Sequence, residues 1–86
     1  MDGVDPDQVE TAERAARAVA GVESARARAR WMGRSLVVEV EGEVANRMSV
    51  EDAEEVGHRV KHAVLDALAG AREVRWTAHV HSEHAA

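Results

Sequence analysis

The sequence has no cysteine, a single proline and only two aromatic residues, both of them tryptophan. The lack of cysteine excludes disulfides, zinc–thiolate sites and a thiol nucleophile, and it disfavours a Cu(I) site, which needs soft ligands. No apolar run approaches the roughly 18 residues of a membrane-spanning helix. The acidic first residues do not form a secretory signal. We therefore expect a cytosolic, soluble chain without covalent cross-links.

The remaining composition indicates a small acidic domain with a shallow core. The 86 residues carry a formal net charge of -5, which argues against a nucleic-acid binder. We expect one domain over residues 1–86, with 1–5 as a linker and 83–86 as a tail. Without Phe or Tyr, the core must be built from small branched side chains around Trp31 and Trp76, with a dimer interface as the alternative role of the two tryptophans. Because such a core buries little surface, we expect a dimer, which would bury more.

Hydrophobic periodicity predicts two helices and three strands. Asp5, directly before the only proline, marks a helix start, and Ser49 with Asp52 three residues later is a variant of the capping box. Gly21 and Gly70 are expected to end the two helices in the left-handed conformation. The predicted elements are helices over 6–20 and 50–68 and strands over 25–31, 36–44 and 73–82.

The element order α-β-β-α-β predicts an α+β fold of the ferredoxin-like or metallochaperone-like type. This fold is a two-layer sandwich with a three-stranded mixed sheet and two helices on one face. The first two strands form a hairpin in which Trp31 pairs with Leu36 and Arg28 faces Glu39. Each strand has one apolar row, so both helices must cover the same face. The second helix is expected to bury Val50, Ala53, Gly57, Val60, Val64 and Leu68.

The last strand carries the clearest functional signal. His79, His81 and Glu83 alternate with other residues and so share one face, about 7 Å apart along the strand. That spacing is within reach of a shared divalent cation, and Glu41 would complete the shell if its strand lies beside the last one. Such donors suit Zn²⁺, Co²⁺, Fe²⁺, Mn²⁺ or Ni²⁺, and binding should weaken below about pH 6, where imidazoles gain protons. The alternative is an exposed strand face that binds no metal.

Other polar residues give weaker signals. His58 and His62 stand four apart in the second helix, and we interpret them as a solvated face, with a shared metal as the alternative. His84 falls in the expected tail. The row of arginines over 26–30 faces a row of glutamates, which favours a charge-paired sheet face over a phosphate site. No catalytic motif is present, so we expect no enzyme and no small-molecule substrate.

Four short segments match a known family in order and spacing. They are Gly21-Val22, Arg28-Ala29-Arg30-Trp31-Met32-Gly33, Met48-Ser49-Val50-Glu51-Asp52-Ala53 and His81-Ser82-Glu83. From about residue 1 to residue 83, the chain resembles the C-terminal cytoplasmic domain of cation diffusion facilitator transporters, which export zinc, iron, cobalt or manganese. Residues 1–5 resemble the linker that leaves the membrane domain.

The resemblance implies a homodimer and a membrane-bound partner. Such domains form V-shaped dimers beneath the six-helix transmembrane domain of the same transporter, on the cytoplasmic side of the cell membrane. A divalent cation, with zinc expected first, binds between the two lobes, draws them together and favours transport. In this chain, repulsion among Glu39, Glu41 and Glu43 of facing lobes is expected to hold the metal-free dimer open.

The family's ligand pattern is only partly present. His81 and Glu83 match the histidine and the acid of the family's last strand. Glu41 and Glu54 stand where members often have ligand histidines, and Ala25 takes a further histidine position of some zinc exporters. The resemblance therefore implies a sparser site of mixed nitrogen and oxygen donors. The alternatives are a structural dimerisation domain without a working metal site and a free-standing αβ protein-interaction module.

Overall fold

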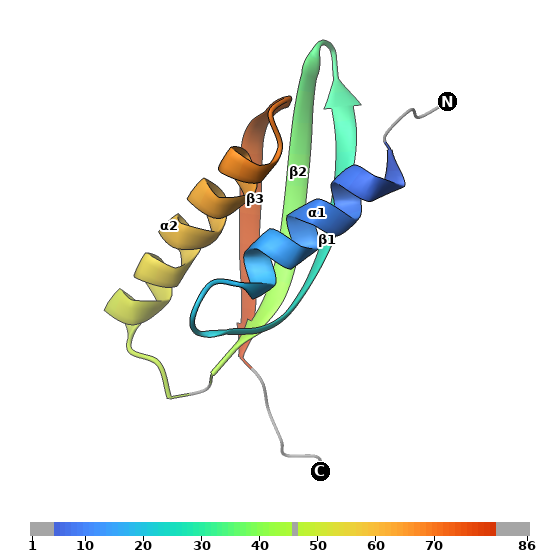
Figure 1. The fold of residues 1–86 in the computed structure, drawn as a ribbon. Coiled ribbons are helices and arrows are strands. Elements are labelled where there is room, and N and C mark those ends of the chain that lie inside the picture. The colour runs from blue at the N-terminus through green and yellow to red at the C-terminus, as the bar shows by residue number, and fades with distance from the viewer. Residues whose placement is uncertain (1–4, 46, 81–86) are drawn as a thin grey trace.

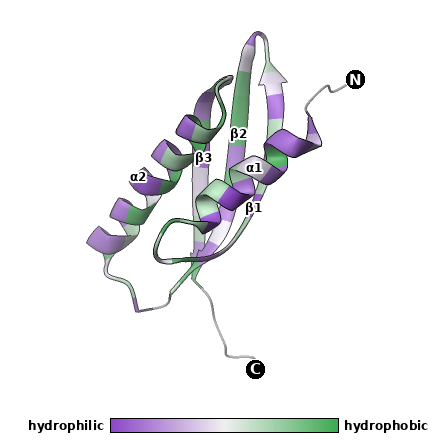
Figure 2. Cartoon of the chain, viewed as in Figure 1, coloured by the Kyte–Doolittle hydropathy of each residue, from purple (hydrophilic) through white to green (hydrophobic). Residues whose placement is uncertain are grey.

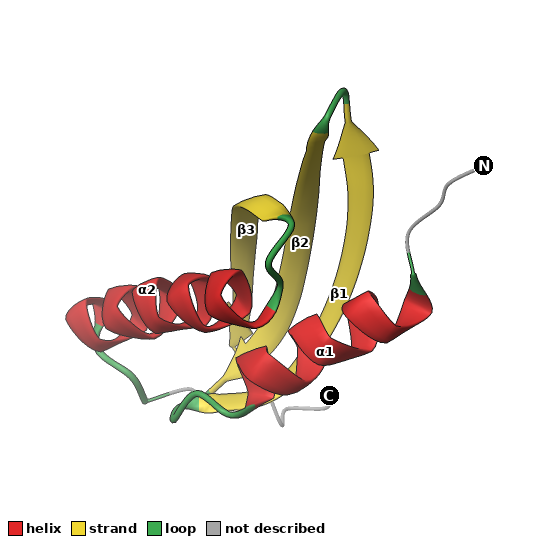
Figure 3. Cartoon of the chain, turned by 45° about the horizontal axis from the view of Figure 1, so that its top comes forward, coloured by secondary structure: helices red, strands yellow, loops and turns green. Residues whose placement is uncertain are grey.

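The computed structural model describes residues 5–45 and 47–80 of the chain. Both helices lie on one face of the three-stranded sheet, so the predicted fold class is confirmed (Figures 1 and 3). No helix within the described ranges is long and apolar enough to cross a membrane. The elements in chain order are α1 (Pro6–Arg17), β1 (Val22–Met32), β2 (Ser35–Val44), α2 (Val50–Ala67) and β3 (Ala71–Val80).

Both predicted helix starts are confirmed by their capping hydrogen bonds. The Asp5 carboxylate accepts a 2.9 Å hydrogen bond from the backbone N–H of Asp7. The Ser49 hydroxyl accepts one of 3.0 Å from the backbone N–H of Asp52. Each bond satisfies one of the amide groups that the first turn of a helix leaves without a backbone partner.

The helix ends differ from the prediction. Helix α1 ends at Arg17 rather than at residue 20, and Gly21, with φ 98°, lies in the turn that follows. Helix α2 ends at Ala67, and its C-cap Leu68 has an extended backbone. Of the described glycines, only Gly21 and Gly33 have positive φ, so Gly70 does not provide the left-handed cap. The chain therefore leaves both helices before it reaches the glycine that was expected to stop them.

The sheet has the order β1-β2-β3, with β1 antiparallel and β3 parallel to β2. The predicted hairpin register is confirmed, since Trp31 pairs with Leu36 and Arg28 with Glu39. Gly33 forms the turn with φ 65°. Strand β3 begins two residues earlier than predicted, and its predicted end at residue 82 lies outside the described residues.

The core is built almost entirely from alanine, valine and leucine, as the composition requires. Figure 2 shows apolar residues along β2, the central strand, and hydrophilic residues along the outer side of α2. Val50, which was expected in the buried stripe, is 78% exposed at the end of α2 that diverges from the sheet (Figure 1). Val56, which was not expected there, is buried. The buried cluster consists of Ala12, Ala16, Ala27, Leu36, Val38, Val40, Val44, Val56, Val60, Val64, Leu68 and Val74.

The expectation that both tryptophans anchor the core is wrong for Trp31. Its side chain is 49% exposed, as is that of its neighbour Met32. The hairpin of β1 and β2 extends beyond both helices, so no second layer covers its end (Figure 1). Trp76, by contrast, is partly buried and packs against the core. Alternation along a strand predicts which face a residue takes, but it does not predict how far the covering layer reaches.

Val37 alternates with the core residue Val38 and so lies on the polar side of β2, yet it is only 3% exposed. It pairs with Arg30 on one side and with Glu73 on the other. Long charged side chains cover apolar neighbours with their methylene groups while their charged ends stay in water. We attribute the burial of Val37 to this cover.

Candidate metal-binding face

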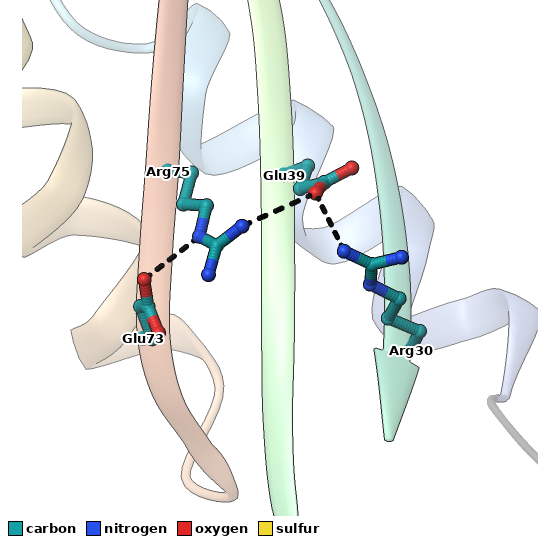
Figure 4. Close-up of polar contacts among 4 residues, drawn as sticks. All are labelled: Arg30, Glu39, Glu73 and Arg75. Atoms are coloured by element: carbon teal, nitrogen blue, oxygen red, sulfur yellow. Dashed lines mark hydrogen bonds and ion pairs between the residues drawn. The ribbon is translucent and has the colours of Figure 1, made fainter. Parts of the chain in front are cut away.

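The sheet face opposite the two helices, here called the open face, carries a chain of ion pairs centred on Glu39 (Figure 4). Its carboxylate lies 3.3 Å from an Arg30 nitrogen and 3.9 Å from an Arg75 nitrogen. Arg75 in turn donates a 2.8 Å hydrogen bond to Glu73. Although Arg28 is the direct pairing partner of Glu39, the ion pair forms with the diagonal neighbour Arg30.

These contacts bridge all three strands but contribute little stability, because the side chains are substantially exposed. The pKa of Arg75 is raised, first by its hydrogen bond with Glu73 and then by the charges of Glu73 and Glu39. The folded state therefore favours a guanidinium that is already positive at neutral pH. Arg75 loses its proton only at strongly alkaline pH, so it adds no pH dependence to stability near neutrality.

At the other end of the open face, Glu41 and His79 meet. Strand β3 lies beside β2, and the His79 Nε2 atom is 3.8 Å from a Glu41 carboxylate oxygen. The condition set for Glu41, that its strand lies beside the last one, is thus met, and its role as a metal ligand stays a prediction. Both side chains are more than half exposed, so a hydrated cation can reach them. They line a hollow of about 290 Å³ together with Ser24, Ala25, Arg26, Gly42 and Glu43.

The described part of the chain does not complete a metal site. Within residues 5–45 and 47–80, no three histidine, aspartate or glutamate side chains are gathered as metal ligands would be. The predicted ligands His81 and Glu83 lie outside the described residues. Glu41 and His79 therefore provide two donors, and any further protein ligand must come from elsewhere.

Glu54 does not join Glu41 and His79. It lies on α2, which covers the opposite face of the sheet, and it borders a groove of about 550 Å³ between α2 and β3. Ala25 stands where some zinc exporters of the family have a histidine. It lines the hollow beside Glu41, but its side chain has no metal-binding atom. The structure thus separates the expected donors onto two faces of the sheet.

The groove between α2 and β3 has a feature that the sequence analysis missed, a slot for the Trp76 indole. A Cβ atom at Gly42 would lie 2.5 Å from the Ser24 carbonyl oxygen and 2.6 Å from the ring of Trp76. A Cβ atom at Gly57 would lie 3.2 Å from the same ring. The two glycines therefore give the indole room between sheet and helix. A glycine inside an apolar strand row, and another inside a helix, are the sequence signals of such a close approach.

The fold and the open charged face define a small metallochaperone-like αβ domain, and solved structures share this architecture. A variant of MamM CTD in a nickel form superposes with a TM-score of 0.83, at 24% identity, over 91% of this chain and 100% of the other. A double variant of MamM CTD gives a TM-score of 0.83 at 26% identity, over 90% and 93% of the two chains.

Sequence comparison identifies the family. The family model "Cation efflux protein, cytoplasmic domain" matches residues 4–83. "Probable cation efflux system" proteins from two strains of Mycobacterium tuberculosis are 36% identical over 63 residues, which is 72% of this chain and 19% of theirs. The chain therefore belongs to the family of cytoplasmic domains of cation efflux proteins, the C-terminal domains of cation diffusion facilitators, as its sequence predicts. It spans about a fifth of the length of the curated relatives it matches.

Proposed function

We propose that this chain is the regulatory and homodimerisation domain of a cation diffusion facilitator, and that it binds a divalent cation between two protomers. The observation that carries the proposal is the exposed pair of Glu41 and His79 at one end of the open face. Family membership supplies the context, a cytoplasmic domain of a cation efflux protein. The transmembrane domain of the same transporter would be its second partner.

The donor set supports a metal site shared between two protomers rather than one completed within a single protomer. Glu41 and His79 offer one carboxylate and one imidazole, which suit Zn²⁺ first and Fe²⁺, Co²⁺, Mn²⁺ or Ni²⁺ as well. By sequence, His81 and Glu83 follow His79 within four residues and are the next donors we assign. Two protomers related by a twofold axis would each bring the same donors to the interface between them, here called the seam. The cation would therefore have enough ligands only in the dimer.

The same carboxylates suggest how metal would act. Glu39 is already balanced by Arg30 and Arg75, so we assign the repulsion between facing protomers to Glu41, which lies at the candidate site. A cation at the seam would neutralise this repulsion and bind the closed arrangement more tightly than the open one. It would shift the population towards the closed form, which we propose favours transport.

One observation favours a second candidate, a dimerisation domain that works without metal. Two family positions for histidine hold Glu54 and Ala25, and the structure places Glu54 away from the Glu41 and His79 pair. If the site has decayed in this way, dimerisation would persist and divalent cations would leave the dimer unchanged.

Calorimetric titration with Zn²⁺ and Mn²⁺ separates the two candidates. A working site predicts that His79→Ala and Glu41→Gln each weaken binding by about tenfold or more, because each removes a donor. Replacement of His81 by alanine should do the same and abolish any metal-induced compaction. Thr77→Ala is the matched control, since Thr77 pairs with Glu41 across the strands and should leave the affinity unchanged. Absence of heat with either metal would rule out the sensing role and leave the structural one.

A further inference from the structure

We propose that His58 and His62 form a second metal site, a two-imidazole chelate on the exposed side of α2 that takes a divalent transition-metal ion such as Cu²⁺ or Ni²⁺. This inference rests on the geometry and surroundings of α2. It does not depend on dimerisation or on the open face. The site would be a surface site with water completing the coordination shell.

The helix sets the geometry of the pair. Helix α2 is continuous over 18 residues, and both histidines lie in its interior. Residues four apart in a helix are neighbours on one face, with Cβ atoms about 5–6 Å apart. Zinc-binding helices use the same spacing when two histidines of one face hold a single ion. His58 and His62 therefore need only side-chain rotation to share a metal.

The surroundings leave both imidazoles available. Both side chains are exposed, and among the described residues neither takes part in a hydrogen bond or ion pair. The nearby cation Arg59 is already engaged by Glu55 at 3.0 Å. Lys61, three residues after His58, is also exposed and lines the same groove as His58.

Acidic residues extend the same stripe in both directions. Glu54 lies four residues before His58, and Asp66 lies four residues after His62. Their charges favour a cation at the pair, although no three donors are gathered within the described residues. Two nitrogens with water in the other positions match the tetragonal preference of Cu²⁺ and Ni²⁺ better than a closed tetrahedral zinc site. This is why we name these ions.

The proposed chelate is distinct from the pair of Glu41 and His79. Helix α2 covers one face of the sheet (Figure 1). Glu41 alternates with the buried Val40 and so lies on the open face, where it meets His79. The fluorescence of Trp76 can report on metal binding at this site, because Trp76 packs against Gly57, the residue next to His58. Since Cu²⁺ quenches indole fluorescence at short range, an ion held at this helix should quench Trp76.

The test uses the full chain with competing histidines removed. The chain has five histidines, so a background in which His79, His81 and His84 are all alanine keeps only the pair. In this background we expect one Cu²⁺ per chain, with two nitrogen ligands visible by electron paramagnetic resonance. His58→Ala or His62→Ala should each lower the affinity about a hundredfold, because loss of one linked donor removes the chelate.

A rescue variant provides the sharper test. Adding Asp66→His to the His58→Ala variant recreates the four-residue spacing one turn further along, between positions 62 and 66. Cu²⁺ affinity should return to within a few-fold of the background protein, and far-UV circular dichroism should show the same helix content throughout.

Titrations that are unchanged by His58→Ala and His62→Ala, or a folded rescue variant that does not regain binding, would overturn the chelate. A chain that binds Cu²⁺ here but shows no response to Zn²⁺ at the open face would instead contradict only the proposed function. The background without His79, His81 and His84 lacks the imidazoles of the open-face site, so a failure of the helix chelate in it can be distinguished from a failure of the proposed function.

Discussion

At the scale of single residues, two glycines set the position of Trp76. Gly42 in β2 and Gly57 in α2 approach opposite parts of one indole, and Gly42 is also close to the Ser24 carbonyl oxygen. Because the contact at Gly42 involves backbone as well as side chain, it leaves little freedom to adjust. The position of the Trp76 ring thus depends on a residue that has no side chain.

Replacing Gly42 by alanine should therefore destabilise the fold. A Cβ atom there would lie 2.5 Å from the Ser24 carbonyl oxygen, so the strands must shift, at a cost of about 1–3 kcal/mol. Urea unfolding followed by circular dichroism measures the change. Gly70→Ala is the control, since no atom lies within 4 Å of its added Cβ atom and its φ is not positive; this variant should be neutral or slightly stabilised. Equal stability of the two variants would show that the close approach is not a constraint.

At the scale of elements, a carboxylate from α1 ties the helix to the edge of the sheet. Glu13 accepts a 2.8 Å hydrogen bond from the backbone N–H of Ala27 in β1, and the contact is partly buried. The first strand is an edge strand, so this amide has no strand partner on its outer side. The bond fixes α1 against β1 and occupies one amide through which another strand could pair with this edge.

Removal of the hydrogen bond between Glu13 and Ala27 should lower the stability of the fold measurably. Glu13→Ala should lower the free energy of unfolding by about 1–3 kcal/mol, because a partly buried amide loses its charged acceptor. Hydrogen exchange of the Ala27 amide should accelerate in the same variant. Glu10→Ala, an exposed position of the same helix, should change stability by less than about 0.5 kcal/mol. A Glu13 variant as stable as the Glu10 control, with unchanged exchange at Ala27, would refute the role of this bond.

The elements also show what sequence alone can predict. Alternation fixed the hairpin register, since opposite charges and one apolar row allow only one pairing, and Asp5 and Ser49 marked the helix starts. The end of α1 was placed too late, because Ala18 and Val19 contain no helix-breaking signal. The contact of Glu13 with Ala27 was not predictable either, since it depends on how the helix is set on the sheet.

At the scale of the whole molecule, the topology brings the candidate site together. The parallel pairing of β2 with β3 places Glu41 and His79 side by side although they are far apart in the sequence. The element order required a parallel pairing for the last strand but left the strand order open, so the sequence predicted this approach only if the two strands were neighbours. The separation of Glu54 from this pair follows from the same element order, because Glu54 belongs to a helix that covers the opposite face of the sheet.

The small core and the exposed apolar residues agree with an assembly of two copies. The largest fully buried side chains are leucine and valine, while Trp31, Val50 and Val80 remain substantially exposed. A domain of this size buries a modest share of its surface on its own, so a partner would add to its stability. The oligomeric state and the proposed metal response can be measured in the same solution.

Light scattering combined with small-angle X-ray scattering, with and without Zn²⁺, tests this account most directly. We predict twice the chain mass of 9.3 kDa in both conditions, and a radius of gyration that exceeds the 13.3 Å of one protomer and decreases when Zn²⁺ is added. His79→Ala should keep the doubled mass and lose the decrease. A single-chain mass, or a radius of gyration that Zn²⁺ leaves unchanged in the parent protein, would contradict a metal-bridged dimer.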